Sequence, residues 1–544
     1  MPSRPTSYPV LPSRLVSMAM IFSIRTRYRG VTGDHDKLPG FNAPFTDFRM
    51  SRVGAIGMVV SFIQSSKSQA REKLTGPNIV LMVADDMGYG DFGLYSEGRV
   101  HTPALDELAT ESLRFTQHYA GSAVCSPSRA ALLTGRYPIR TGAITPQEVL
   151  GNDRIALGEA TIADSFKAAG YATGMVGKWH NGALDPRFHP NARGFDEFAG
   201  FRGGWADYYR WNLDRNGSLE RSDGRYLTDV LADKAVEFIG RHKSEPFFLM
   251  VTWNAPHSPL QAPDDVTRKY VEAGFEHGIA LIYAMIEVMD RGIAKIREAL
   301  HTVGVEDDTL LMFTSDNGPA FNHRPDQVPE GVSLDGSRFN CGFAGAKGSV
   351  YEGGIRVPMI ARWANGLPQD GEVLDQVCFT DWLPTLLSLA GASHVGDKPI
   401  DGHDVSAVLR GNSPTEQPRR FWQWNGDSPV GTTNAAMRHG DWKLVRPALD
   451  IPYATEADKR LADRYVEQDI EYKYHPENFS EIFDWPEPEK VVPEPPPPEL
   501  YDLSIDPGET HDVAADNSVV ASRMLAELET WFEEVETERR LIVD

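Results

Sequence analysis

The stretch Ser122-Ala-Val-Cys-Ser-Pro-Ser-Arg-Ala-Ala-Leu-Leu-Thr-Gly-Arg136 is the segment around which the rest of the chain can be interpreted. Pro127 suits a first helical position, Ser126 can cap the exposed amides, and residues 130–133 are good helix formers. We therefore expect a helix whose positive end lies at or just after Cys125, so that this side chain faces any anion bound there. Taken alone, a Cys-x-Pro-x-Arg pentapeptide more often marks a buried structural cysteine.

Short apolar runs of strand length on both sides of this stretch indicate a sheet. They cover residues 78–84, 171–176, 247–253 and 309–314. Strands without polar alternation, interleaved with helical patterns, are typical of a mostly parallel sheet covered on both faces. The helical pattern at 161–169 begins with Thr-x-x-Asp and ends before Gly170, which are start and stop signals. The fold class we expect is α/β, with a large mixed, mostly parallel sheet flanked by helices over residues 77–395.

Residues 396–544 predict a smaller C-terminal α+β domain. A helix at 381–391, stopped by glycine, closes the first domain. Beyond it we expect a strand at 441–446, a strand and turn at 500–509, and an amphipathic terminal helix at 518–538. The acidic, proline-rich residues 485–498 indicate a loop or insertion with polyproline tendency.

The first 76 residues form an N-terminal extension of different character. Residues 1–49 show no sustained period, whereas Met50 begins a basic start, an apolar run at 53–63 and small residues near 68–70. This layout is typical of a signal peptide and predicts a periplasmic or secreted protein if translation starts at Met50. The alternative is a short buried or interfacial helix. No other run reaches the length of a membrane span, and the charged run 278–300 predicts an amphipathic helix.

Charge and cysteine content argue against a nucleic-acid-binding protein and against a disulfide-stabilised one. The net charge is -23, from 77 acidic and 54 basic residues, so the surface repels nucleic acid and an anionic substrate needs a local basic pocket. Cys125, Cys341 and Cys378 are too few for a disulfide framework. Cys341 and Cys378 could pair in an oxidising compartment, but two free, mostly buried thiols are the favoured interpretation.

Polar side chains follow each of the four strand-like runs. They are Asp85 and Asp86, then Lys178 with His180, then His257, and then Asp316 with Asn317. Because ligands bind beyond the carboxyl ends of parallel strands, we expect these groups to converge. The four Asp and Asn residues offer hard oxygen ligands for calcium, or less favourably magnesium. Taken singly, each motif is more often a turn or a helix cap.

The Cys125 motif with its Leu-Thr-Gly-Arg extension resembles the signature of the type I, formylglycine-dependent sulfatases. Two further stretches match that family, Gly177-Lys-Trp-His-Asn-Gly182 and Lys347-Gly-Ser-Val-Tyr-Glu-Gly-Gly-Ile-Arg-Val-Pro358. The resemblance runs from about residue 77 to the end and includes the motif at 499–509. Asn181 replaces the family's usual Leu, and 511–513 also departs from the pattern without touching a catalytic motif.

The resemblance implies the fold of the alkaline phosphatase superfamily and hydrolysis of sulfate esters. Cys125 would be converted to 3-oxoalanine (formylglycine) by a formylglycine-generating or anaerobic sulfatase-maturating enzyme, and it would join the calcium ligands. Its hydrated form would attack sulfur. Cations would neutralise the sulfate oxygens and histidines would move protons. These groups are Arg129, Lys178, Lys347, His180 and His257.

The substrate is the least determined feature of the sequence. Residues 202–212 are dense in aromatic, basic and amide groups, and they predict a carbohydrate pocket formed by Arg202, Trp205, Asp207 and Arg210, with Asn181 nearby. Such aromatics are as often simple loop packing. We expect oligosaccharides of a sulfated polysaccharide as substrates. The alternatives are a phosphate or phosphonate monoester hydrolase on the same scaffold and an inactive glycan-binding protein. The sugar, endo or exo action and oligomeric state stay open.

Overall fold

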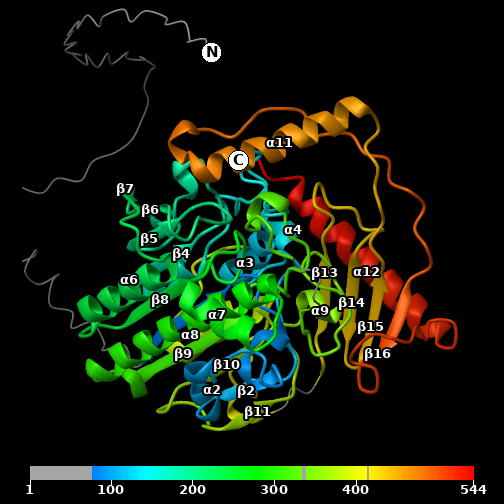
Figure 1. The fold of residues 1–544 in the computed structure, drawn as a ribbon. Helices are drawn as coiled ribbons and strands as arrows, with labels where there is room; N and C mark the ends of the chain where they lie inside the picture. The colour runs from blue at the N-terminus through cyan, green and yellow to red at the C-terminus, as the bar shows by residue number, and fades with distance from the viewer. Residues whose placement is uncertain (1–75, 334–337, 413–415, 544) are drawn as a thin grey trace, which may run out of the picture. The chain divides into compact units, whose positions relative to one another are not determined.

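The computed structural model describes residues 76–333, 338–412 and 416–543, which belong to one compact unit (Figure 1). The predicted signal sequence at Met50 lies outside these residues. Within them, no helix combines the length and the apolar character needed to cross a membrane.

A ten-stranded mixed sheet forms the centre of the fold, as the apolar runs predicted. Its middle strands β9, β1, β8, β4 and β5 are parallel, and β10, β6 and β7 run antiparallel to their neighbours. The order is β11 (Gly371–Val373), β2 (Leu113–Phe115), β10 (Met359–Arg362), β9 (Thr309–Ser315), β1 (Asn78–Ala84), β8 (Phe247–Thr252), β4 (Ala172–Lys178), β5 (Glu197–Phe201), β6 (Asn212–Arg215) and β7 (Ser218–Arg221). Val83 pairs with both Thr252 and Thr314, so these three strands end at the same level.

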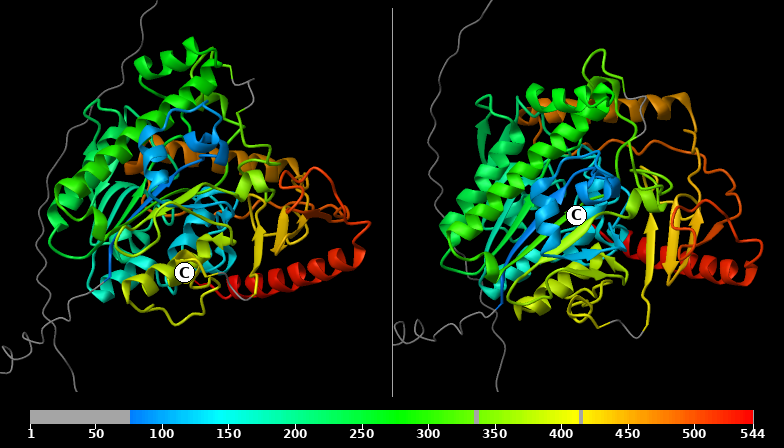
Figure 2. Two further views of the ribbon diagram at one scale, coloured as in Figure 1. Left: turned by 90° about the horizontal axis from the view of Figure 1, so that it is seen from below. Right: turned by 60° about the horizontal axis from the view of Figure 1, so that its bottom comes forward.

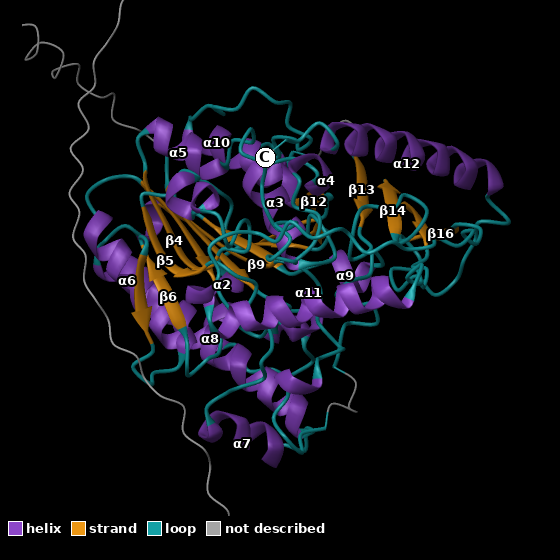
Figure 3. Ribbon diagram, turned by 90° about the horizontal axis from the view of Figure 1, so that it is seen from above, coloured by secondary structure: helices purple, strands orange, loops and turns teal. Residues whose placement is uncertain are grey.

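Helices cover both faces of this sheet (Figure 3). One face packs on α2 (Pro103–Thr110), α6 (Leu227–His242) and α8 (His277–Thr302), with α7 (Asp264–Glu272) packed on α8; the other face packs on α3 (Cys125–Thr134), α5 (Ile162–Ala169) and α10 (Trp382–Ala390). Successive residues of β1 alternate between the two cores: Val80 and Met82 belong to the first, Ile79 and Leu81 to the second. Burial on both faces explains why the strands lack polar alternation.

Two helix starts test the capping predictions. Thr161 caps α5 through a reciprocal pair of hydrogen bonds with Asp164, and left-handed Gly170 ends the helix, so this prediction is confirmed. The cap predicted at Ser126 is wrong, because α3 already begins at Cys125 after the extended residue Val124. Ser126 therefore lies inside the first turn, where its hydroxyl donates to the carbonyl of Asp153 at 3.1 Å.

A smaller antiparallel sheet lies in the C-terminal part, as expected (Figure 2). It consists of β13 (Arg419–Gln423), β14 (Ala435–His439), β15 (Trp442–Arg446) and β16 (Glu499–Asp502). Helix α12 (Ser518–Arg539) packs against it through an apolar cluster that includes Trp531. Residues 485–498 contain no helix or strand. The division at residue 395 stays a prediction.

Two short strands and three α-helices of the described residues lie outside these groups. They are β3 (His118–Tyr119) paired with β12 (Val377–Cys378), α4 (Pro138–Thr141), α9 (Glu352–Ile355) and α11 (Glu456–Tyr474). Helix α11 was not predicted, and it lies outside both main sheets (Figure 1). Cys341 and Cys378 are free thiols, as the cysteine count favoured.

Candidate active site

The carboxyl ends of β1, β4, β8 and β9 bring the predicted polar groups together. Lys178 Nζ contacts Asp85 Oδ2 at 2.7 Å, and Asn317 Nδ2 donates to Asp86 Oδ1 at 2.8 Å. The amide of Asp86 donates to Asp316 Oδ1 at 3.3 Å. All five side chains are buried. The parallel register explains this convergence, because strands that end at one level deliver the residues that follow them to one place.

Residue 125 lies at the N-terminal end of α3, where the helix dipole favours negative charge. Arg129, one turn later, donates from Nε to Asp316 Oδ2 at 2.8 Å and from Nη1 to the Lys178 carbonyl at 3.0 Å. A negative charge at residue 125 would favour the charged forms of Arg129, Lys347 and Lys473. The surroundings of residue 125, which the sequence marked as central, therefore favour negative charge there.

Lys347 is held by the loop that contains it. Its backbone amide donates to the Pro319 carbonyl at 2.9 Å, and the next amide, of Gly348, donates to the Ala123 carbonyl at 2.8 Å. These bonds tie the Lys347 loop to the segment leading into α3. The Lys347 ammonium then reaches both carboxylate oxygens of Asp86, at 2.7 and 2.8 Å.

Burial and charge oppose each other at the carboxylates. Burial raises the pKa of Asp85 in spite of Lys178, and burial with the charge of Asp85 raises the pKa of Asp316 to about 6. Burial also disfavours ionised Asp86, but Lys347, His257 and Lys178 outweigh it and lower the pKa of that carboxyl. The cluster is an acidic site whose charge depends on neighbouring cations.

The oxygen-rich cluster has the chemistry of a site for a hard cation. Asp85 Oδ1 and Asn317 Oδ1 are buried and find no hydrogen-bond partner among the described residues. Asp85, Asp86 and His257 present potential ligand atoms within 4.8 Å of one another. This compact group of carboxylates and imidazole contains His257, which was not a predicted ligand, and does not include Asp316. The residues fit a divalent metal ion, with two oxygens whose bonding capacity is unused by the protein.

The two histidines have defined hydrogen-bonding patterns. His180 Nε2 lies 3.1 Å from the Pro146 carbonyl and 3.5 Å from Glu148 Oε1, whereas its buried Nδ1 has no partner among the described residues. Nε2 therefore carries the proton and Nδ1 presents a lone pair. His257 Nδ1 donates to the Ser258 carbonyl at 2.5 Å, which leaves Nε2 as its lone pair, 3.7 Å from Asp86 Oδ2.

Both imidazole rings are stabilised in the neutral form. Burial and Lys178 lower the pKa of His180 well below its usual value. Burial and Lys347 lower the pKa of His257 to about 3. Both His180 and Asp86 have positive φ, 54° and 65°, a strained conformation for non-glycine residues that is frequent at functional sites.

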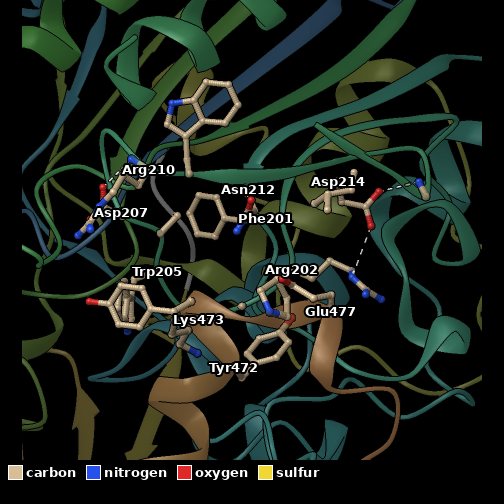
Figure 4. Close-up of a pocket in the computed structure, with 17 residues that line it drawn as sticks. Phe201, Arg202, Trp205, Asp207, Arg210, Asn212, Asp214, Tyr472, Lys473 and Glu477 are labelled. Atoms are coloured by element: carbon tan, nitrogen blue, oxygen red, sulfur yellow. Dashed lines mark hydrogen bonds and ion pairs between the residues drawn. The ribbon is translucent and has the colours of Figure 1, made fainter. Parts of the chain in front are cut away.

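The predicted carbohydrate residues line a cavity of about 250 Å³ (Figure 4). Arg202, Trp205, Asp207 and Arg210 all contribute to it. Asn181 does not: it is fully buried, and its amide donates to the carbonyls of Ser126 and Asp153. Its expected place at the pocket is wrong, because the first turn of α3 covers it.

Sequence reasoning missed two charged residues of this region. Glu148 accepts a hydrogen bond from the Gly204 amide at 2.5 Å, and Lys473 of α11 contacts the same carboxylate oxygen. Both side chains are at least 95% buried, with 1% and 5% exposed. Glu148 lies in an irregular loop and Lys473 in a polar helix, so no local pattern distinguished them from solvent-exposed charges.

Comparisons with known proteins agree with this arrangement. Residues 77–392 match the family model described as Sulfatase. The chain is 35% identical over 414 residues to the N-acetylgalactosamine-6-sulfatase of Canis lupus familiaris, covering 69% of this chain and 74% of that protein. It is 32% identical over 423 residues to the steryl-sulfatase of Mus musculus, covering 62% and 65%. The solved structure of Ps i-CgsB in complex with k-i-k-neocarrahexaose has a TM-score of 0.68 at 29% identity, covering 84% of this chain and 93% of that one.

Proposed function

This chain belongs to the sulfatase family and is a sulfuric ester hydrolase, and from that premise we propose that it desulfates carbohydrates with a formylglycine made from Cys125. The observation that carries the proposal is the environment of residue 125. It stands at the start of α3, one turn before Arg129 and next to the segment that the Lys347 loop contacts, beside a buried acidic cluster and two neutral histidines.

The modified residue is the reactive group of the proposal. A formylglycine-generating or anaerobic sulfatase-maturating enzyme would oxidise Cys125 to 3-oxoalanine. Hydrated, that aldehyde supplies one hydroxyl that attacks sulfur and a second that permits release of sulfate. Unmodified cysteine or serine lacks the second hydroxyl. The amides at the start of α3 and the Arg129 guanidinium stabilise negative charge at this position.

The protein's cations bind the sulfate group in this proposal. Arg129 is rigid because Asp316 and the Lys178 carbonyl hold its guanidinium. Lys178 and Lys347 are held at Asp85 and Asp86, which follow the end of β1. Positions preset by the protein cost little reorganisation when charge develops on the sulfate oxygens.

Proton transfer is assigned to the two histidines and to Lys347. His180 uses its unpartnered Nδ1 as the acceptor that deprotonates residue 125. His257 and Lys347, both against Asp86, face the departing alcohol and donate to its oxygen. His257 is neutral in the protein, and the negative charge of a bound ester favours its protonation.

Asp85, Asp86, Asp316 and Asn317, together with residue 125, would hold one divalent ion. Bound there, the ion would stabilise negative charge on the nucleophile and on the sulfate oxygens. The hard oxygen donors and the unused Oδ1 atoms of Asp85 and Asn317 favour calcium, whose coordination number is flexible, over magnesium.

The carbohydrate assignment is supported by the cavity beside the site. Trp205 and Phe201 supply apolar surface there, and Arg202, Asp207 and Arg210 supply polar groups. Two of the relatives above are named for, or bound to, carbohydrates, whereas another is a steryl-sulfatase. Family membership therefore leaves the substrate class open, and the lining of the cavity supports a carbohydrate. The signal at Met50 supports export to the periplasm or outside the cell.

Mass spectrometry and sulfate release test the proposal. The peptide containing residue 125 should show loss of sulfur and an aldehyde. The enzyme should release sulfate from defined sulfated oligosaccharides faster than from an aryl sulfate, and faster than it releases phosphate from matched esters. An active enzyme with an intact Cys125 thiol contradicts the nucleophile. Faster phosphate release supports the phosphate or phosphonate hydrolase, and an unmodified, inactive protein supports a glycan-binding role.

A further inference from the structure

Helix α11 reaches the active site from a part of the chain beyond the family match, which ends at residue 392. Tyr465 and Tyr472 of α11 belong to an apolar cluster with Val149, Ala183 and Leu184. The amide of Val149 also donates to Asp469 Oδ1 at 2.9 Å. These contacts fasten the end of α11 to the loops that follow α4 and β4.

Lys473 extends from this anchored end into the region between His180 and the cavity. Its ammonium contacts Glu148, which lies 3.5 Å from His180 Nε2. The same side chain lines the cavity, and a negative charge at residue 125 would favour its charged form. Figure 4 shows Tyr472, Lys473 and Glu477 on one side of the cavity and Phe201 and Asn212 on the other.

Two glycines make this approach possible. A Cβ at Gly203 would lie 2.9 Å from Tyr472 Cε1 and 3.4 Å from Lys473 Nζ. A Cβ at Gly204 would lie 2.7 Å from His180 Cε1. The backbone at 203–204 therefore fills the narrow space between α11 and His180, and a side chain at either position would separate them.

The charge balance makes Lys473 a receptor for an anion. Burial lowers the pKa of Lys473 to about 7, so an anion arriving at this site would stabilise the ammonium. Each of the cavity cations has a carboxylate partner: Lys473 pairs with Glu148, Arg202 with Asp214 at 3.5 Å, and Arg210 with Asp207 at 3.4 Å. Among the three cations that line the cavity, Lys473 is the one whose carboxylate partner, Glu148, also lies 3.5 Å from His180 Nε2.

We propose that Lys473 is a specificity-determining residue, whose ammonium binds a second anionic group on the sugar next to the scissile ester. This inference rests on the proposed carbohydrate sulfatase function. The second anion is a carboxylate or a further sulfate, since both present oxygens to an ammonium. Glu148 orients the ammonium from the opposite side. The preferred substrate is thus a sugar with at least two negative charges.

The test compares three sulfated disaccharides that differ only beside the scissile ester, with a hydroxyl, a carboxylate or a second sulfate there. The wild-type kcat/KM should be at least about tenfold higher for a doubly charged substrate, since a charge-assisted hydrogen bond adds about 1.5–3 kcal/mol. Comparison of the carboxylate and the second-sulfate substrates identifies which anion is bound. Lys473→Met should reduce the ratio of kcat/KM for the charged substrates to kcat/KM for the neutral one about 10- to 100-fold, mainly through KM. Lys473→Arg should retain most of this ratio.

A matched control and a binding measurement keep the test decisive. Lys459→Met removes an exposed cation from the other end of α11 and should leave the ratio unchanged. Calorimetry on the wild-type enzyme should show tighter binding of the desulfated product that keeps its second anion than of the neutral product. This measurement does not depend on how well a variant folds.

Three outcomes separate the possible failures. A wild-type enzyme without preference for the doubly charged substrates, or a Lys473→Met variant with equal losses on all three, overturns the role of Lys473 and leaves the sulfatase chemistry standing. A wild-type enzyme that releases sulfate from an aryl ester but from none of the sugars overturns the carbohydrate assignment and this inference with it.

Discussion

Substitution of Gly204 by alanine should reduce turnover by displacing His180. The new Cβ would lie 2.7 Å from His180 Cε1, 2.9 Å from Nε2 and 3.1 Å from Glu148 Oε1. The first distance is about 0.7 Å shorter than the 3.4 Å at which ordinary contact begins. The ring is buried and donates to the Pro146 carbonyl, so it cannot rotate into solvent and must shift as a unit.

A displacement of this size has a calculable cost. Misplacing a reacting group by about 1 Å reduces rates about 100-fold, so a shift of about 0.7 Å should lower kcat about 10- to 100-fold. This corresponds to about 1.4–2.7 kcal/mol on the barrier. Overpacking itself costs about 1–3 kcal/mol of folding stability, which an ordinary domain tolerates.

The assay is steady-state sulfate release, with the formylglycine content of each preparation determined by mass spectrometry. Gly240→Ala is the control, because Gly240 is an exposed residue of α6 whose added Cβ would meet nothing within 4 Å. It should raise stability by about 0.5–1 kcal/mol and leave the kinetics unchanged. A Gly204→Ala enzyme with full formylglycine and wild-type kcat would refute the assignment of His180 as the proton acceptor.

Three further predictions concern α11 and the acidic cluster. Gly203→Ala, whose Cβ would push on Tyr472 rather than on His180, should raise KM for sugar substrates more than it lowers kcat; an equal loss in kcat would contradict the separation of the two roles. Burial raises the pKa of Asp469 from 3.8 to about 7, so its contribution to stability is present below pH 4 and is lost as pH rises through 7. Asp469→Asn should remove up to about 4 kcal/mol of the fall in the free energy of unfolding over this range, measured by denaturant unfolding at several pH values, and an unchanged slope would count against it. Calcium at about 100 times its Kd should stabilise the wild-type protein by about 2.7 kcal/mol in thermal unfolding, and Asp316→Asn, which keeps an acceptor for Arg129, should reduce this gain; absence of a calcium effect in the wild type would contradict the metal site.

The Asp316 carboxylate also shows why the choice of variant matters. It accepts two contacts from the buried Arg129, at 2.8 Å from Nε and 2.7 Å from Nη2. Removing it with alanine would leave a buried guanidinium without its carboxylate partner, which typically costs about 3–5 kcal/mol. Loss of activity in such a variant would not distinguish a missing metal ligand from a damaged fold, so the isosteric asparagine is the informative change.

The sequence by itself determined the central sheet and the polar residues that stand at the carboxyl ends of its parallel strands. Continuous apolar runs specified β1, β8 and β9 almost to the residue, because strands buried on both faces need apolar side chains at every position. Parallel strands must end at a common edge, so Asp85, Lys178 and Asp316 could be expected to meet before any contact was seen. The start and end of α5 could also be predicted, since a capping box and a C-terminal glycine act within a few residues.

Only the tertiary structure decided how the chain completes the site from distant segments. Lys473 and Glu148 are 325 positions apart, and nothing in the local sequence around either residue indicates the other. Asn181 follows a strand like the residues of the acidic cluster, yet the backbone of Ser126 and Asp153 covers it. Local periodicity reports which face of an element is apolar. Which buried polar group faces the cavity depends instead on long-range packing, where each side chain's burial is set by segments that no local pattern describes.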